Sequence, residues 1–341
     1  MPEYNVLATQ IASNILYQAS LAGLGNSMLF APSSIATGDI NGDGFNDIFC
    51  TPWISGYQAK PLVLIGDGTG KFTDQTSKYF SSSVAFDVAK TVSIADFNSD
   101  GMNDLMVFDT GSEDPSDFVN GNFPGAKNQY FLQTSTGFVS QSLPNNGSAT
   151  FNHTSATADM DADGDIDYLG TQLGGPNFTG FGLTLGENVA GQITDNSSLL
   201  PIEIRYKLSA NWSLYTGLNF QVPGAVSAAD MNNDGRNDII TASYGQDNLT
   251  GQMTVRISSQ NADGTFSQQI VGTMPQALKD KGFAGAVSLS AGDIDGDGKK
   301  DLAIVWEAPG KSAVQILHND GNGFSDVTTS ILGSNLFREV N

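Results

Sequence analysis

Hydrophobic and polar residues follow one order that recurs five times along the chain. A run of small residues comes first, and a short acidic stretch follows it. An apolar run rich in β-forming residues comes next: IFC after Asp47, LMVF after Asp104, IIT after Asp238 and LAIVW after Asp301. Short apolar runs bounded by turn residues predict β-strands. Each recurring unit therefore begins with two strands, A and B, joined by an acidic loop.

A second pattern follows within each unit: an apolar strand, a turn usually carrying Gly with Asn or Asp, and a strand usually opened by Phe. The segments are VLIGDGTGKFTD from Val63, YFLQTSTGFVSQ from Tyr130, LTLGENVAGQITD from Leu183, VRISSQNADGTFSQ from Val255 and VQILHNDGNGFSD from Val314. This pattern is typical of a β-hairpin and supplies strands C and D. Four-stranded antiparallel units repeated along a chain predict a β-propeller.

The predicted fold is an all-β propeller of four-stranded antiparallel blades, and we expect residues 1–341 to form a single domain. The first acidic residues of the five loops lie 57, 63, 71 and 63 residues apart. Residues 1–29 are expected to form a partial blade or a closing strand, which leaves room for a sixth or seventh blade. The expected repeat units are about 30–85, 86–145, 146–200, 220–275 and 283–330.

The acidic loops read DINGDGFND, DFNSDGMND, DMDADGDID, DMNNDGRND and DIDGDGKKD. Each carries oxygen-bearing side chains at positions 1, 3, 5 and 9, the donors that a hard cation such as Ca²⁺ prefers. A glycine stands at position 6, where the sharp turn needs a positive φ. The sequence therefore predicts five Ca²⁺ sites, about five ions in all. The predicted ligands are Asp39, Asn41, Asp43 and Asp47; Asp96, Asn98, Asp100 and Asp104; Asp159, Asp161, Asp163 and Asp167; Asp230, Asn232, Asp234 and Asp238; and Asp293, Asp295, Asp297 and Asp301.

An EF-hand shares the first half of this pattern, but it needs a bidentate Glu at position 12 and a helix on each side. Strands rather than helices are predicted around the loops. Position 12 is occupied by Cys50, Val107, Gly170, Thr241 and Ile304. The EF-hand interpretation is therefore excluded in every unit.

The segments GDINGDGFND, AADMNNDGRND and AGDIDGDGKKD, each followed by an apolar strand and a Gly-rich hairpin, resemble FG-GAP (VCBS-type) repeats. Such repeats build integrin α-subunit propellers and occur in many secreted bacterial proteins. The resemblance covers about residues 30 to 330 and implies calcium in the AB loops at one face and partner binding at the other. It does not imply one activity, because the family includes adhesins, lectin-like modules and scaffolds of polysaccharide-cleaving enzymes. Integrin propellers have seven blades, whereas five complete units are countable here.

The chain has 36 acidic residues and a net charge of −21. Seventeen of the acidic residues stand at predicted ligand positions, and five Ca²⁺ ions would reduce the net charge to −11. The remaining negative charge argues against nucleic acid as a partner. No run of eighteen apolar residues is present, so no membrane insertion is expected. The sequence does not indicate the oligomeric state.

The calcium loops favour an extracellular or cell-surface location, although the N-terminal residues show no signal-peptide pattern. The single Cys50 allows no disulfide within the chain and is expected to be buried. Neither histidine, His153 or His318, lies in a catalytic motif, and both are expected to be structural or surface residues. The chain is therefore not expected to be an enzyme. The alternative is a propeller-based polysaccharide lyase or hydrolase.

Recognition of a glycan or protein ligand is expected on the face opposite the calcium loops, where long connections between strands B and C gather. Trp53, Tyr244 and Trp306 stand at the same point, just after strand B. Repeated aromatic rings on one face can stack on sugars or anchor a protein, although they can also pack between blades. Arg205 and Trp212 lie in the Ser197–Val222 connection, which is expected to form an extra hairpin. They are further candidate ligand-binding residues, because a basic side chain close to aromatic rings can bind an acidic sugar or a carboxylate, although the hairpin can also be only a decoration of the blade rim.

Overall fold

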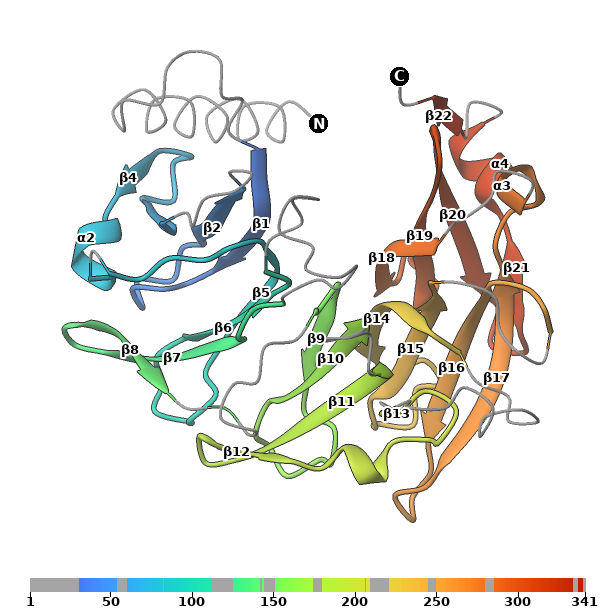
Figure 1. Ribbon diagram of the computed structural model, residues 1–341, viewed down its shortest axis with the longest axis horizontal. Coiled ribbons are helices and arrows are strands. Elements are labelled where there is room, and N and C mark those ends of the chain that lie inside the picture. Colours follow the sequence, from blue (N-terminus) through green and yellow to red (C-terminus); the bar gives the residue numbers. More distant parts are fainter. Residues whose placement is uncertain are drawn as a thin grey trace. The chain divides into compact units, whose positions relative to one another are not determined.

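The computed structural model describes residues 31–53, 60–81, 83–111, 125–141, 143, 151–173, 180–205, 207–208, 221–244, 250–279, 285–333 and 337–339 (Figure 1). The fold is an all-β five-bladed propeller, and each blade is an antiparallel sheet in which strands A to D are neighbours in chain order. The chain divides into two compact units, Met1–Ala149 with blades 1 and 2, and Thr150–Asn341 with blades 3 to 5. The predicted four-stranded repeat is confirmed.

The first unit contains two sheets. Blade 1 consists of β1 (Ala31–Gly38), β2 (Asp47–Trp53), β3 (Leu62–Gly66) and β4 (Phe72–Asp74). The helix α2 (Thr76–Tyr79) connects it to blade 2, which consists of β5 (Ala89–Ala95), β6 (Asp104–Asp109), β7 (Gln129–Thr134) and β8 (Gly137–Gln141). The predicted partial blade at residues 1–29 lies outside the described residues.

The second unit contains three sheets. Blade 3 consists of β9 (Ser155–Ala158), β10 (Asp167–Leu173), β11 (Gly180–Val189) and β12 (Gln192–Asp195). Blade 4 consists of β14 (Pro223–Ala229), β15 (Asp238–Ser243), β16 (Thr254–Gln260) and β17 (Phe266–Thr273). Blade 5 consists of β18 (Gly285–Gly292), β19 (Asp301–Ala308), β20 (Lys311–Asn319) and β21 (Phe324–Asp326).

Short elements extend the second unit. The helices η3 (Ser197–Leu199), α3 (Gln276–Lys279) and α4 (Thr328–Leu332) each follow a strand D. Two further strands pair with a strand C: β13 (Lys207–Leu208) with β11, and β22 (Phe337–Glu339) with β20. Of the expected hairpin in the Ser197–Val222 connection, β13 is seen, and residues 209–220 lie outside the described part. No helix in the described ranges is long and apolar enough to cross a bilayer.

Neighbouring blades approach most closely along their A strands, where β1 lies against β5, β9 against β14, and β14 against β18. A Cβ on Gly38 of β1 would come within 2.9 Å of Ile94 Cγ2. A Cβ on Gly224 of β14 would come within 2.5 Å of the carbonyl oxygen of Ala286. The small residues of the A strands are therefore required by the distance between blades.

Apolar side chains fill the space between blades. Between blades 1 and 2, Phe80 contacts Phe131 edge to face, with ring centroids 5.4 Å apart, and Phe49 contacts Phe86 at 6.4 Å. Between blades 4 and 5, the buried cluster includes Ile240 of β15 and Ile304 of β19. These clusters hold each acidic loop on a rigid sheet.

Side-chain amides at the end of strand C also join neighbouring blades. Each donates to the backbone carbonyl at position 2 of the preceding blade's acidic loop, and we call them the interblade amides. They are Gln133 to Ile40 at 2.8 Å, Gln260 to Met160 at 2.8 Å, and Asn319 to Met231 at 3.0 Å. Each acidic loop that accepts such a bond is therefore coupled to the blade that follows it.

Replacing an interblade amide by an apolar side chain of similar length should destabilise the protein. In Gln133→Met the buried carbonyl of Ile40 loses its donor, and an unpaired buried polar group costs about 1–3 kcal/mol. Urea unfolding measures this loss. The control is Gln269→Met on the exposed side of β17, where a change of less than about 0.5 kcal/mol is expected. Equal effects of the two substitutions would contradict the coupling.

Candidate metal centres

Each acidic loop connects strand A to strand B of its blade and takes left-handed backbone at two positions. The position-6 glycines have φ between 84° and 97°, which confirms the turn expected from the sequence: Gly44, Gly101, Gly164, Gly235 and Gly298. Position 4 also has positive φ, between 58° and 82°: Gly42, Ser99, Ala162, Asn233 and Gly296. The sequence analysis missed this second turn because the residue type at position 4 varies from loop to loop.

Replacing Ala162 by glycine should therefore stabilise the protein. Ala162 has a φ of 63°, a region that costs a residue with a Cβ about 1–2 kcal/mol. Part of that gain is offset by the greater freedom of glycine in the unfolded chain, so we expect a net gain of about 0.5–1 kcal/mol in urea unfolding. The matched control, Ala158→Gly in β9, should lose stability. A loss at both positions would contradict the left-handed assignment.

The first aspartate of each loop accepts hydrogen bonds from the backbone of its own loop. In blade 1, Asp39 Oδ1 accepts from the N–H groups of Gly42 (2.7 Å) and Asp43 (3.1 Å), and Oδ2 accepts from Gly44 (2.8 Å). The bond from the position-6 glycine recurs in all five loops. These bonds draw the loop around the first carboxylate, as a cation-binding loop requires.

The ninth-position aspartates are buried, with 0–1% of each residue exposed: Asp47, Asp104, Asp167, Asp238 and Asp301. One carboxylate oxygen accepts from the N–H at position 2 of the loop, at 2.7–3.0 Å. The other accepts from an N–H at the end of strand C, at 2.7–3.0 Å. The ninth aspartate therefore ties the loop to strand C, a role that the sequence pattern does not reveal. Its oxygens keep further lone pairs for a cation.

Burial raises the pKa of Asp104 and Asp167 to about 6, against the opposing effect of their backbone hydrogen bonds. Burial also raises the pKa of Asp47 and Asp238. In the third loop, burial and then the carboxyl of Glu187 raise the pKa of Asp161 to about 6. Crowded carboxylates of this kind are stabilised by a bound proton or by a bound cation.

The metal-free protein should therefore be more stable at about pH 5 than at about pH 8. An exposed Asp has a pKa near 3.9, whereas Asp104 and Asp167 titrate at about 6 in the folded state. The folded state binds more protons between these values, so stability falls as the pH rises through about 6. Melting curves at both pH values in EDTA measure the effect. A higher melting temperature at the higher pH would contradict it. Excess Ca²⁺ should weaken the trend, because the cation binds the ionised carboxylates.

Two loops bring three carboxylates within 4.8 Å of one another: Asp159, Asp161 and Asp167 in the third, and Asp293, Asp295 and Asp297 in the fifth. In the third loop, Asp159 Oδ1 is buried and accepts no hydrogen bond from any residue within the described ranges. In the first, second and fourth loops, the position-3 Asn donates to the position-5 Asp at 2.8–3.0 Å. These oxygen donors fit a hard divalent cation, and the orphaned Asp159 oxygen is the observation that favours one.

The structure corrects one predicted ligand-binding residue. Trp306 is fully buried in β19, and its Nε1–H donates to Gln315 Oε1 at 2.9 Å, so its ring belongs to the core. Tyr244 is half-buried, and its ring lies 5.2 Å from that of His153. Arg205 is half-buried and donates to the Ser198 carbonyl at 2.8 Å. The side chain of Trp53 and the whole of Trp212 lie outside the described part of the structure.

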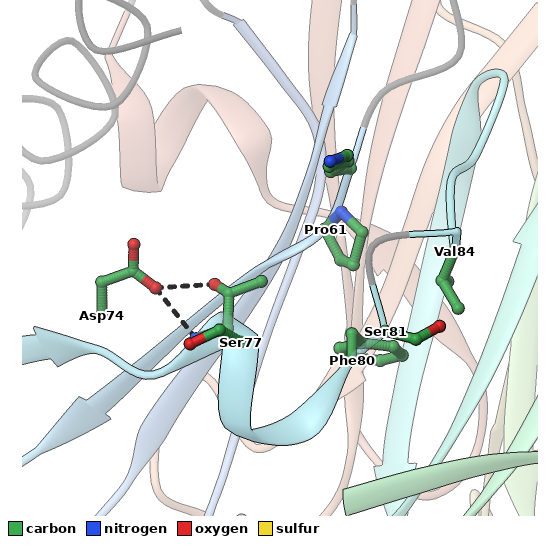
Figure 2. A pocket seen from close by; sticks show the side chains of 8 residues that line it. Pro61, Asp74, Ser77, Phe80, Ser81 and Val84 are labelled. Atoms are coloured by element: carbon green, nitrogen blue, oxygen red, sulfur yellow. Dashed lines mark hydrogen bonds between the residues drawn. The ribbon is translucent and has the colours of Figure 1, made fainter.

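A cavity of about 300 Å³ opens in blade 1, and the sequence analysis did not anticipate it (Figure 2). Lys60 and Pro61 line it just before β3, and Asp74, Ser77, Phe80 and Val84 line it from the D strand and the connection to blade 2. Asp74 Oδ1 accepts from the N–H and the hydroxyl of Thr76, at 2.9 and 2.7 Å. The cavity therefore lies at the BC and DA end of the blade, away from the acidic loop.

Solved structures of low similarity overlap most of the chain. A lectin of Aleuria aurantia, a mutant form in complex with α-methyl-L-fucoside, is 9% identical and has a TM-score of 0.45, covering 90% of this chain and 77% of its own. The exotype rhamnogalacturonan lyase YesX is 13% identical at a TM-score of 0.39, covering 88% of this chain and 55% of its own. A putative 6-phosphogluconolactonase of Bacteroides uniformis is 11% identical and has a TM-score of 0.40. The match covers 93% of this chain and 88% of the other.

The repeats and one sequence relative are more informative. The FG-GAP-like repeat family matches residues 39–107 and 230–304, which include the first, second, fourth and fifth acidic loops. Integrin alpha pat-2 of Caenorhabditis elegans is 27% identical over an alignment 215 residues long, which covers 56% of this chain. That match spans 16% of the integrin, so this chain corresponds to a small part of it. Residues 39–107 and 230–304 of this chain match FG-GAP-like repeats, and the chain is similar to part of an integrin α subunit.

Proposed function

We propose that this protein is a calcium-stabilised propeller that binds an extracellular glycan or protein ligand and does no chemistry itself. In this proposal the five acidic loops bind Ca²⁺ through the side chains at positions 1, 3, 5 and 9. The ligand binds at the opposite end of the blades, where the BC and DA connections gather. The similarity to an integrin α chain supports an adhesive or recognition role at the cell surface.

The difference between the two ends of each blade carries the proposal. The AB loops all have the same length, as 39–46 and 159–166 illustrate. The BC connections vary widely, from 110–128 in blade 2 to the two-residue turn 309–310 in blade 5. Constant, hydrogen-bonded loops fit a repeated structural site. Connections of variable length on a rigid scaffold are where recognition usually evolves.

The BC end also has the features of a binding surface. Asp109, 1% exposed, anchors the base of the longest connection by accepting from the N–H groups of Asp87, Val88 and Gly111, each at 2.8 Å. In blade 1, the cavity is lined by the exposed Lys60 and by the buried Phe80. A cation next to an apolar floor suits an acidic sugar or a carboxylate side chain.

A glycan array probed with about 2 mM Ca²⁺, and in parallel with EDTA, tests the proposal. Binding that needs Ca²⁺ is expected, and Trp53→Ala and Lys60→Ala should each weaken it at least about tenfold, or 1.4 kcal/mol. The matched control is Phe45→Ala, because Phe45 is a 47% exposed ring in an acidic loop. If Phe45→Ala alone lost binding, the ligand would bind at the end of the blades that carries the acidic loops, which would contradict the proposal. Silence on the array would direct the search to a protein ligand, and turnover of an anionic polysaccharide would contradict the non-enzymatic role.

A further inference from the structure

We propose that the fifth acidic loop and His318 form a mixed imidazole and carboxylate site that takes a divalent transition-metal ion such as Zn²⁺ in preference to Ca²⁺. The inference rests on the proposed function, because it takes the acidic loops to be cation sites. The inference adds that the fifth acidic loop selects a different ion from the other four loops.

His318 occupies a position that recurs once in every blade. In each blade, one residue at the end of strand C donates its N–H to the ninth aspartate. In blade 5 this residue is Asn319, and His318 directly precedes it. In blades 3 and 5 the side chain of the preceding residue contacts the acidic loop, through Glu187 with Asp161 and His318 with Asp295. The five equivalent residues are Ile65, Leu132, Glu187, Ser259 and His318. Among these, an imidazole is present in blade 5 alone.

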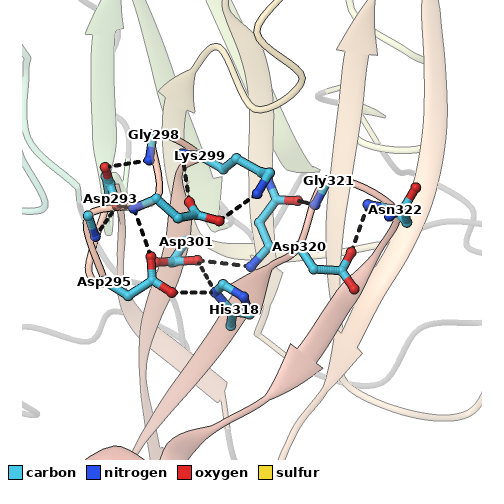
Figure 3. Close-up of polar contacts among 12 residues, drawn as sticks. Asp293, Asp295, Gly298, Lys299, Asp301, His318, Asp320, Gly321 and Asn322 are labelled. Atoms are coloured by element: carbon cyan, nitrogen blue, oxygen red, sulfur yellow. Dashed lines mark hydrogen bonds and ion pairs between the residues drawn. The ribbon is translucent and has the colours of Figure 1, made fainter.

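The imidazole faces two carboxylates of its loop (Figure 3). His318 Nδ1 lies 3.0 Å from Asp301 Oδ1 and 3.3 Å from Asp295 Oδ2, and the three side chains place one ligand atom each within 4.8 Å of the others. Two donors bound at about 2.0–2.2 Å to one ion, at 90–110° to each other, lie about 3.0–3.5 Å apart. The separations seen here are those of neighbouring ligands on such an ion.

The site is held in place before any ion binds. Asp301 is buried, and its oxygens accept from the N–H groups of Asn319 at 2.9 Å and Ile294 at 3.0 Å. The His318 side chain is 25% exposed and Asp295 is 46% exposed, so solvent reaches the donors from one side. A rigid buried carboxylate beside two accessible donors leaves an entry path for an ion.

The donor set decides which ion is preferred. Ca²⁺ takes six to eight oxygen ligands, whereas Zn²⁺ and its neighbours bind an imidazole nitrogen together with carboxylate oxygens. Lys299 Nζ also pairs with Asp297, so one of the four loop carboxylates is already neutralised. A nitrogen donor and a reduced negative charge both weaken the preference for Ca²⁺ at this loop.

Blade 3 provides an internal comparison. Its loop also has Asp at position 3, which is Asp161. Glu187, the residue of strand C equivalent to His318, forms a side-chain hydrogen bond with Asp161. All donors in blade 3 are therefore oxygens, so its loop remains a site for a hard cation. The two blades differ chiefly in whether strand C supplies a carboxylate or an imidazole.

Titration calorimetry of Zn²⁺ into untagged wild-type protein, in buffer that contains about 2 mM Ca²⁺, tests the inference. One Zn²⁺ per chain is expected. His318→Gln keeps a hydrogen-bond donor for Asp301 but removes the imidazole, and it should weaken Zn²⁺ binding at least about a hundredfold. His153→Gln, which changes the other histidine of the chain, is the matched control and should bind as the wild type does. Substituting Co²⁺ gives a second readout, a visible absorption band that His318→Gln should lose.

Zn²⁺ binding that is equally tight in His318→Gln, or no Zn²⁺ binding by the wild type, would overturn the inference. Melting curves of the same proteins with Ca²⁺ and with EDTA separate this outcome from failure of the proposed function. If Ca²⁺ stabilises both proteins and Zn²⁺ binding is independent of His318, the transition-metal site alone is wrong. If Ca²⁺ stabilises neither protein, the acidic loops are not calcium sites.

Discussion

Removing Ca²⁺ with EDTA is expected to lower the melting temperature by about 10–15 °C. At about 2 mM Ca²⁺ and a dissociation constant near 10⁻⁴ M, each filled site stabilises the folded state by about 1.8 kcal/mol. The first compact unit holds two acidic loops and the second holds three, so the expected losses are about 4 and 5 kcal/mol. For units of this size, each kcal/mol corresponds to about 2–4 °C.

Asp159→Ala identifies the metal as the cause of this effect. The substitution removes a first-position carboxylate whose Oδ1 is buried without a hydrogen bond from any described residue. In Ca²⁺ the variant should lose about the 1.8 kcal/mol of one site. In EDTA it should unfold close to the wild type, because the loss of one hydrogen bond from Gly164 is offset by weaker repulsion among the remaining carboxylates. Equal losses in both conditions would mean that the third loop holds no cation.

Asp238→Ala is expected to destabilise the protein by about 4 kcal/mol in EDTA. In Ca²⁺ the loss should be about 6 kcal/mol, because the fourth cation site is lost as well. Asp238 is fully buried, and its oxygens accept from the N–H groups of Met231 and Gln260, each at 3.0 Å. The substitution leaves two buried donors unpaired, at about 1–3 kcal/mol each. The contrast with Asp159→Ala in EDTA separates the ninth position, which supports the fold even without the ion, from the first position, which serves the ion.

Urea unfolding of Asp238→Ala and Asp238→Asn in EDTA provides the measurement. The Asn variant keeps one acceptor oxygen and should lose about half as much as the Ala variant. If Asp238→Ala and Asp159→Ala have the same free energy of unfolding in EDTA, the hydrogen bonds of Asp238 between the loop and strand C do not stabilise the metal-free protein.

Most of the fold could be predicted from the sequence, because the signals that determine it are local. A glycine that must take positive φ follows three oxygen-bearing residues in each loop, and Gly44 and Gly298 behave as expected. The hairpins were equally clear, since the segments from Val63 and Val314 became β3–β4 and β20–β21. Turn chemistry and strand alternation act over a few residues, so one sequence is enough to read them.

Residues whose roles depend on contacts between strands were harder to predict. The spacing from the first aspartate places Trp306 with Trp53 and Tyr244, but β19 extends to Ala308, so Trp306 is a strand residue whose ring is buried in the core. The signal was present, since Leu302, Ile304 and Trp306 alternate and all three are fully buried. The sequence alone predicts a structural or surface role for His318, because the distance of His318 from Asp301 depends on the pairing of β19 with β20.

Calcium titration into the metal-free wild-type protein, in zinc-free buffer, tests the central claim most directly. Calorimetry should show saturable binding of about five Ca²⁺ per chain, and Asp159→Ala should bind one fewer. Absence of saturable binding, or the same stoichiometry in the variant, would contradict the assignment of the five acidic loops as cation sites.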